Sequence, residues 1–459
     1  KDAGSTGSEV VFEERDARFR MSFRRAAEGS RLMLELNSRD ASEVWALPWV
    51  GGGALQNEQW ETGAATGGAW HCLGQRASGL TYSGDYDGGG SGGSDARYVI
   101  ITNDGGAAVE GAMRVLSEVD ARSGLGRSSW RPVEAMADGA DVERTLESVQ
   151  CFSGVAAIEG RRNGASAVYL WRYSDDSVLL ADGESLHAVD GAGGAIADVA
   201  ALTDEGQWSV RLCPADEQRY ADGAIRLEHS APTIPPQVLE VALPSGVATG
   251  LTGAVRVLWA QPLPAGFAPS DYVSGRVWAT ADDGAQIPIS LLWRVDGDAN
   301  DAGARAALLN GYGAYGFCTD PAWDVDRMAV ASCGLVHAIC HVRGGGELGR
   351  AWHAAGRREH KATSFSDMLA CARRLVDAGI ARADGLAIEG RSAGGLLVGA
   401  TLNLAPSTFC VALASVPFLD PAGTLQDATQ PLTVNEWDEF GNPNEQGAHD
   451  DVLGFSPLH

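Results

Sequence analysis

The hydrophobic pattern of the chain changes near residue 275, and this change constrains the fold more than any other feature. Before it, short apolar runs such as 32–36 and 208–212 recur between turn-forming residues, without a long helical period. Many short strands at such spacing are typical of a β-sandwich or a β-propeller. After it, strands alternate with helices, which indicates a parallel sheet covered by helices. We therefore expect two domains, residues 1–272 and residues 273–459.

Two local patterns give sharper structural predictions. The segment 84–95 (GDYDGGGSGGSD) is low in complexity and rich in glycine, so we expect a flexible insertion there. Between Ser364 and Gly379 the apolar residues fall on one helical face. Ser364 can cap the start of this helix, with Asp367 at the third helical position, and Gly379 can close its end.

Composition excludes several classes of protein. Hydrophobic residues make up 45% of the 459 residues and charged residues 21%, which excludes a wholly disordered chain. No apolar run approaches the roughly 18 residues that span a bilayer, so no membrane helix is expected. The formal charge of −25 disfavours binding to nucleic acid and to anionic membrane surfaces, and it suits cationic ligands such as basic peptides.

The eight cysteines are scattered along the chain, and no pair has C-x-x-C spacing. This distribution does not indicate a zinc or redox site. Scattered cysteines in a chain of this length are typical of thiols in a reducing compartment, which suggests a cytoplasmic protein.

The motif that carries chemistry is Gly390-Arg391-Ser392-Ala393-Gly394, a G-x-S-x-G sequence between a predicted strand and a predicted helix. A serine becomes a good nucleophile when a sharp strand-to-helix turn exposes its hydroxyl. The flanking residues must be small because the helix passes close to the strand. The N–H of Ala393, at the helix N-terminus, would point at a developing oxyanion. The pattern predicts that Ser392 is a catalytic nucleophile.

The segment 388–397 (IEGRSAGGLL) resembles the nucleophile segment of the prolyl oligopeptidase family of serine peptidases, and within it the oligopeptidase B branch. The resemblance is weak before residue 275 and strong after it. Further matching stretches occur in the same order along the chain: 11–16 (VFEERD), 281–284 (ADDG), 287–290 (IPIS), 311–316 (GYGAYG), 341–349 (HVRGGGELG), 416–420 (VPFLD), 431–433 (PLT) and 436–443 (EWDEFGNP).

This resemblance implies a β-propeller placed over an α/β-hydrolase domain, and cleavage of short peptides after Arg or Lys. It implies no metal or organic cofactor, and the sequence gives no oligomeric state. Tyr312 matches the tyrosine whose hydroxyl completes the oxyanion hole, so the glycines of 343–346 are expected only to form a tight turn. Glu436 matches the acid that binds the basic side chain of the substrate, and Asp438 replaces a second glutamate.

Asp320 matches one of two family carboxylates associated with substrate binding, but the partner position is Ala322. Asp324 or Asp326 could substitute for that partner, although their spacing does not establish it.

The sequence does not supply a complete catalytic triad. In this fold the aspartate and the histidine follow the serine, and only His449 and His459 lie beyond Ser392. Neither has the family context, so the chain is expected to be a fragment that is inactive alone.

Two alternatives remain open. One is a prolyl oligopeptidase or an acyl-peptide hydrolase on the same scaffold. The acidic segment around Glu436 argues against this alternative, because the substrate pockets of those enzymes are expected to be apolar. The other is a non-catalytic protein that uses the propeller as a binding module.

Overall fold

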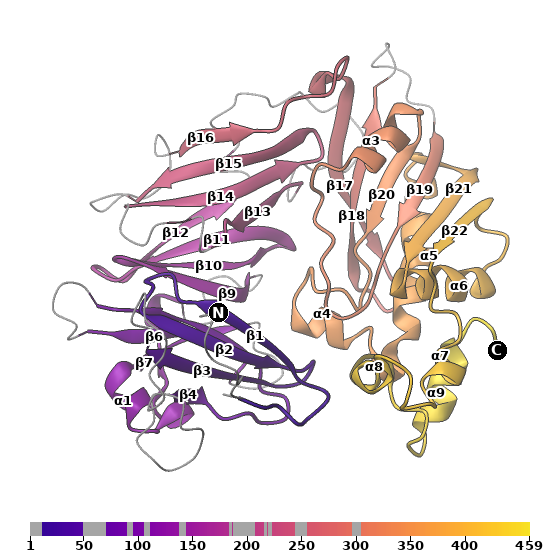
Figure 1. Ribbon diagram of the computed structural model, residues 1–459. Coiled ribbons are helices and arrows are strands. Elements are labelled where there is room, and N and C mark those ends of the chain that lie inside the picture. Colours follow the sequence, from indigo (N-terminus) through magenta and orange to yellow (C-terminus); the bar gives the residue numbers. More distant parts are fainter. Residues whose placement is uncertain are drawn as a thin grey trace, which may run out of the picture.

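The computed structural model describes residues 12–48, 70–89, 95–104, 111–136, 144–182, 186, 207–214, 218, 223–243, 255–295 and 304–459. Two parts are distinct in Figure 1: a group of antiparallel sheets formed by the first part of the chain, and one larger sheet with helices formed by the second. We call them the propeller part and the hydrolase part. The helices α4 and α8 lie on the side of the hydrolase part that faces the propeller strands.

In the part of the chain that the structure describes, the propeller part contains four sheets of four strands each, all with antiparallel neighbours. Each sheet is a meander in which consecutive strands pair. Their strands are β1 (Arg20–Arg25), β2 (Arg31–Asn37), β3 (Ser42–Pro48), β4 (His71–Gly74), β5 (Tyr82–Asp87), β6 (Arg97–Thr102), β7 (Ala112–Ser117), β8 (Arg131–Pro132), β9 (Arg144–Phe152), β10 (Val155–Arg162), β11 (Ala165–Arg172), β12 (Ser177–Asp182), β13 (Ser209–Leu212), β14 (Ala224–Ala231), β15 (Ile234–Ala242) and β16 (Val255–Ala260).

Local sequence explains how these meanders turn. Between β10 and β11, Asn163 and Gly164 both have positive φ angles, 51° and 77°. Two such residues form the two-residue turn that matches the twist of a β-hairpin, and Asn-Gly is the pair that adopts it most easily. The strands on either side are almost wholly buried, with side chains that pack against the neighbouring sheets.

The hydrolase part is built on a six-stranded mixed sheet of order β17-β18-β20-β19-β21-β22. The β17–β18 and β18–β20 pairs are antiparallel, and the β20–β19, β19–β21 and β21–β22 pairs are parallel. The bounds are β17 (Tyr272–Thr280), β18 (Gln286–Arg294), β19 (Arg305–Asn310), β20 (Val336–Cys340), β21 (Ala381–Arg391) and β22 (Val411–Ser415). The prediction of parallel strands alternating with helices is confirmed for β19 to β22.

Helices cover both faces of this sheet. The large core joins the sheet to α5 and α6, whereas Met328 and Ala331 of α3 pack against Leu292 on the other face. The helices are α1 (Glu118–Arg122), in the propeller part, and α3 (Val325–Ser332), α4 (Arg350–Ala354), α5 (Ala362–Asp377), α6 (Ala393–Leu404), α7 (Pro421–Thr424), α8 (Thr433–Phe440) and α9 (Ala448–Phe455).

The helix predicted between Ser364 and Gly379 is α5, but its predicted N-cap is wrong. The N-cap is Lys361, three residues earlier, so the helix begins at Ala362 and Ser364 lies inside it. The buried Ser364 hydroxyl instead donates a hydrogen bond to the carbonyl of Arg343 at 2.6 Å. This bond satisfies a backbone carbonyl of a neighbouring loop. Gly379 follows the helix at φ 68°, and its N–H donates to the carbonyl of Val376, as the closing role requires.

The prediction of a flexible insertion at 84–95 is wrong at its start. Residues 84–87 belong to β5, where Asp85 is fully buried and forms an ion pair with Arg24 at 2.8 Å. The glycine-rich centre, 90–94, lies outside the described residues. Gly84 lies close to the neighbouring strand: a Cβ atom there would lie 3.1 Å from the carbonyl oxygen of Val99.

No described helix is long and apolar enough to cross a membrane.

Candidate active site

Ser392 is the single residue between β21, which ends at Arg391, and α6, which begins at Ala393. Its backbone has φ 59° and ψ −116°, a conformation that residues other than glycine rarely adopt. The turn is held from both sides: the Ser392 N–H donates to the carbonyl of Ser415 at 3.0 Å, and the Ser392 carbonyl accepts from Phe418 at 3.2 Å. The side chain is therefore exposed at the N-terminus of a helix, as the nucleophile elbow requires.

The glycines around Ser392 are required by close backbone approaches. A Cβ atom on Gly390 would lie 2.1 Å from the carbonyl oxygen of Gly394, and one on Gly395 would lie 2.5 Å from the side chain of Pro417. A Cβ atom on Gly394 would lie 2.7 Å from the carbonyl oxygen of Gly311. The same small residues that close the elbow thus let the loop after β19 reach the serine.

That loop, residues 311–316, brings Tyr312 to Ser392. Tyr312 lies against the elbow, since a Cβ atom on Gly394 would lie 3.5 Å from its ring, and its hydroxyl is close enough to Ser392 to interact with it. Burial raises the pKa of Tyr312, and the carboxylate of Glu436 raises it further, so its hydroxyl stays protonated as a donor. Two of the residues predicted from the sequence therefore meet, and the N-terminus of α6 places Ala393 beside them.

The glycine-rich segment 343–346 supports this loop from behind. A Cβ atom on Gly344 would lie 2.2 Å from the carbonyl oxygen of Gly313, and one on Gly346 would lie 2.2 Å from that of Gly316. These glycines therefore allow one loop to lie directly against another, in addition to the turn expected from the sequence. Arg343 fixes the segment through ion pairs with the buried Asp367, at 2.6 Å, and with Asp283.

Glu436, on α8, lies close to Tyr312 and has two partners. Its Oε2 atom accepts from the Tyr315 hydroxyl at 2.7 Å. Its Oε1 atom lies 3.3 Å from the guanidinium of Arg39, which comes from the turn between β2 and β3 in the propeller part. Burial and Glu436 raise the pKa of Tyr315 far above its ordinary range. The carboxylate expected to bind a cation is thus already in contact with one, and Arg39 was not found from the sequence.

Asp438 and Asp320 do not join Glu436. Asp438 points to Arg358, whose guanidinium lies 3.3 Å from its Oδ1 atom. Asp320 is buried between two propeller arginines, Arg161 at 2.8 Å and Arg211 at 3.1 Å. Their substrate-binding roles stay predictions.

Glu439 is a site residue that the sequence reasoning missed. It is fully buried, and its Oε1 atom accepts the N–H of Tyr315 at 2.8 Å while its Oε2 atom lies 2.8 Å from His353 Nε2. Tyr315 has φ 63°, so this bond holds a strained residue of the loop. The i, i+3 spacing from Glu436 was the available signal, since it places both acids on one side of α8.

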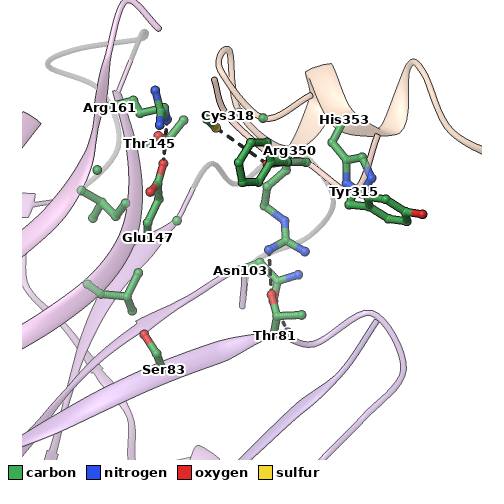
Figure 2. A pocket seen from close by; sticks show the side chains of 18 of the residues that line it. Thr81, Ser83, Asn103, Thr145, Glu147, Arg161, Tyr315, Cys318, Arg350 and His353 are labelled. Carbon is green, nitrogen blue, oxygen red and sulfur yellow. Dashed lines mark hydrogen bonds and ion pairs between the residues drawn. The ribbon is translucent and has the colours of Figure 1, made fainter. Parts of the chain in front are cut away.

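A cavity of about 950 Å³ lies between the two parts, next to this site. Figure 2 shows Thr81, Thr145, Glu147 and Arg161 of the propeller part on one side, and Tyr315, Cys318, Arg350 and His353 of the hydrolase part on the other. Arg39 and Glu439 also line it. A chamber of this size can hold a few residues of an extended peptide, but not a folded protein.

Among the described residues, no histidine forms a hydrogen bond with Ser392. Five of the described histidines have other side-chain partners: His337 lies near Glu389, His341 bonds Ser290, His353 bonds Glu439, His360 lies 3.9 Å from Glu359, and His459 lies 3.0 Å from Asp420. In the same residues, no group of His, Cys, Asp and Glu side chains is arranged to hold a metal ion. The described site thus brings together the predicted nucleophile and the predicted oxyanion donors.

The nucleophile elbow on a mixed sheet, facing a set of four-stranded meanders, defines the fold class: an α/β-hydrolase domain joined to a β-propeller. The comparison with family models agrees, since the model of the prolyl oligopeptidase family matches residues 322–459. The chain fits the prolyl oligopeptidase family of serine peptidases, and its relatives and structural neighbours include the oligopeptidase B type.

Among curated relatives, dipeptidyl aminopeptidase BI of Pseudoxanthomonas mexicana is 32% identical over 98% of this chain and 53% of its own length. Protease 2 of Moraxella lacunata is 30% identical over 69% of this chain and 41% of its own length. The chain therefore spans about half the length of the curated relatives it matches, or less.

Two solved structures match closely in fold. Oligopeptidase B from Leishmania major superimposes with a TM-score of 0.77 at 30% identity, over 98% of this chain and 56% of that one. Oligopeptidase B from Trypanosoma brucei, with covalently bound antipain in a closed form, gives 0.78 at 29% identity, with the same coverage.

Proposed function

We propose that the protein is a serine endopeptidase that cleaves short peptides after Arg or Lys. The observation that carries this proposal is the proximity of three groups: Ser392 in the elbow, the Tyr312 hydroxyl beside it, and the Glu436 carboxylate near Tyr312. Nucleophile, oxyanion donor and a carboxylate for a basic side chain are three of the groups that this reaction needs, and a base for the serine proton is the fourth. The family membership supports the reaction class.

In this mechanism the Ser392 hydroxyl attacks the carbonyl carbon of the scissile peptide bond. The Tyr312 hydroxyl and the N–H of Ala393 stabilise the oxyanion that forms. The C–N bond then breaks, the leaving amine takes the proton, and water hydrolyses the acyl group from Ser392. The base that accepts the serine proton is contributed by residues other than those described here.

Glu436 would set the specificity. An Arg side chain can give a carboxylate two parallel N–H bonds, and a partly desolvated carboxylate favours such a cation strongly. Its side chain is 14% exposed, so water screens the interaction only in part. The cavity beside it would admit short unfolded peptides. The scattered cysteines support a cytoplasmic location as part of the same proposal.

The test compares Glu436→Gln with the parent in the complete gene product, on matched peptides with Arg or Phe before the cleaved bond. The Arg peptide should lose roughly one to two decades in kcat/KM, since a hydrogen bond to a charged group contributes about 1.5–3 kcal/mol. The Phe peptide should change little.

Asp438→Asn is the matched control, because it removes a carboxylate from the same helix that faces Arg358 instead. Equal losses on both peptides in Glu436→Gln would assign this residue to the fold and exclude it from specificity.

A further inference from the structure

Arg39 reaches from the propeller part into the hydrolase part at the site of Glu436. Its Nε atom donates to the carbonyl of Asn435 at 3.0 Å, and its terminal nitrogen lies 3.3 Å from the Glu436 carboxylate. Its guanidinium carbon lies 4.0 Å from the centre of the Tyr315 ring. A carboxylate, a backbone carbonyl and an aromatic face are three features that a site for a guanidinium ligand would offer.

The turn that carries Arg39 is rigidly built. The Ser38 N–H donates to the carbonyl of Ala41 at 2.9 Å, and the Ser38 hydroxyl accepts from the N–H of Ala41 at 2.9 Å. Asp40 accepts from the Ser78 hydroxyl at 2.8 Å and from the N–H of Gly79 at 3.0 Å. The residues on both sides of Arg39 are therefore fixed to the propeller, so Arg39 enters or leaves the site as a side chain or with its whole sheet.

The contact is suited to release. Arg39 is 29% exposed and Glu436 14% exposed, whereas Arg161 and Asp320, which also link the two parts, are 4% and 5% exposed. Water reaches the Arg39–Glu436 pair more than the Arg161–Asp320 pair, so opening the first should cost less than opening the second, because breaking a buried pair leaves an uncompensated buried charge. The link at Arg161 can persist while the link at Arg39 opens.

We propose that Arg39 is a specificity-determining residue: it occupies the cation subsite formed by Glu436, the Asn435 carbonyl and Tyr315, and a basic substrate side chain binds there by displacing it. This inference rests on the proposed function, since it requires that Glu436 binds the substrate cation. Its consequence is that the propeller competes with the substrate. Apparent affinity for a cation is reduced by the fraction of molecules in which Arg39 fills the subsite.

The test measures binding of agmatine, a small guanidinium compound, to the 459-residue chain by NMR titration. Arg39→Ala should bind agmatine roughly three- to tenfold more tightly than the parent, which corresponds to a subsite that Arg39 fills for most of the time. Arg39→Gln, which keeps most of the side-chain length, is the second variant. It should also bind agmatine more tightly than the parent. Circular dichroism melts report whether each variant is folded.

The matched control is Arg350→Ala. Arg350 is a hydrolase-part arginine whose guanidinium bonds the Thr81 hydroxyl of the propeller across the same cavity at 2.6 Å. Its removal should leave agmatine affinity unchanged. Equal tightening in Arg350→Ala and Arg39→Ala would attribute the gain to a looser interface and overturn the displacement model.

A second pair of variants separates this inference from the proposed function. Glu436→Gln introduced into Arg39→Ala should abolish the gained affinity. Unchanged or weaker binding in Arg39→Ala, together with weaker binding in Glu436→Gln, would overturn the role of Arg39 and leave Glu436 as the cation subsite. If Glu436→Gln leaves the affinity for agmatine unchanged in both the parent and Arg39→Ala, the proposed specificity itself is overturned.

Discussion

At the scale of single residues, Tyr312 and Tyr315 share one loop but have different partners. Tyr312 lies beside Ser392, whereas the Tyr315 hydroxyl donates a hydrogen bond to Glu436. In the complete gene product, Tyr312→Phe should lower kcat by roughly 10²–10³, since it removes one oxyanion donor. Tyr315→Phe, the control, should mainly raise KM for Arg peptides. Steady-state kinetics of both variants test this assignment, and an unchanged kcat in Tyr312→Phe would make Tyr312 a packing residue.

A second residue-scale prediction concerns Lys361, which is fully buried and donates to the carbonyls of Gly313 and Gly356. Burial lowers its pKa from 10.5 to about 8, although Glu439 opposes the change. The unfolded chain binds this proton up to about pH 10.5 and the folded chain only up to about pH 8. The free energy of unfolding therefore rises with pH between these two values, by roughly 3 kcal/mol.

The melting temperature of the parent, relative to that of Lys361→Met, should increase from pH 8 to pH 10. A constant difference between the two proteins across this range would mean that the lysine remains charged where it is buried.

At the scale of elements, the elbow between β21 and α6 was predictable because all its requirements are local. The strand, the serine and the glycines lie within about ten residues, and the steric need for Gly390 follows from the turn itself. The start of α5 was not predictable in the same way: Ser364 has the chemistry of a cap, but it lies opposite the Arg343 carbonyl, more than twenty residues earlier in the chain. Tertiary contact overrode the local preference.

The elbow can be tested through Gly390. A Cβ atom there would lie 2.1 Å from the Gly394 carbonyl, so Gly390→Ala must move backbone. Overpacking of this kind typically costs about 1–3 kcal/mol. We expect a lower melting temperature and slower labelling of Ser392 by a fluorophosphonate in the complete gene product.

The matched control is Gly454→Ala in α9, where an added Cβ atom meets nothing within 4 Å. Its effect should be neutral or stabilising, because alanine favours a helix over glycine. Labelling at the parent rate in Gly390→Ala would show that the elbow tolerates a side chain.

At the scale of the whole molecule, the two-part architecture was predictable but the contacts between the parts were not. Periodicity separates meanders from alternating strands and helices. It cannot pair Arg39 with Glu436, 397 residues apart, or Arg161 with Asp320, 159 residues apart. The prediction for Asp320 came from a family pattern of substrate-binding acids. In this chain, Arg161 and Arg211 both form ion pairs with the Asp320 carboxylate.

Asp320 should therefore hold the two parts together. Burial alone would raise its pKa, but Arg161 and Arg211 more than offset burial and hold it below its ordinary value. The carboxylate thus stays charged, and its contribution is lost only as the pH falls below about 3.9, the pKa of an unfolded aspartate. At neutral pH, Asp320→Ala leaves Arg161 buried without this partner, a change that costs about 3–5 kcal/mol for buried pairs.

Because two parts are involved, one unfolding free energy is not defined, and calorimetry is the appropriate measurement. We expect Asp320→Ala to separate the unfolding of the propeller part from that of the hydrolase part, with the first transition at lower temperature than in the parent. Arg211→Gln is the control: Arg211 contacts the same carboxylate but is 59% exposed, so its loss should cost less than about 1 kcal/mol. If both variants shift the transitions equally, the buried pair with Arg161 does not hold the interface, and the contact at Arg39 must carry more of it than its exposure indicates.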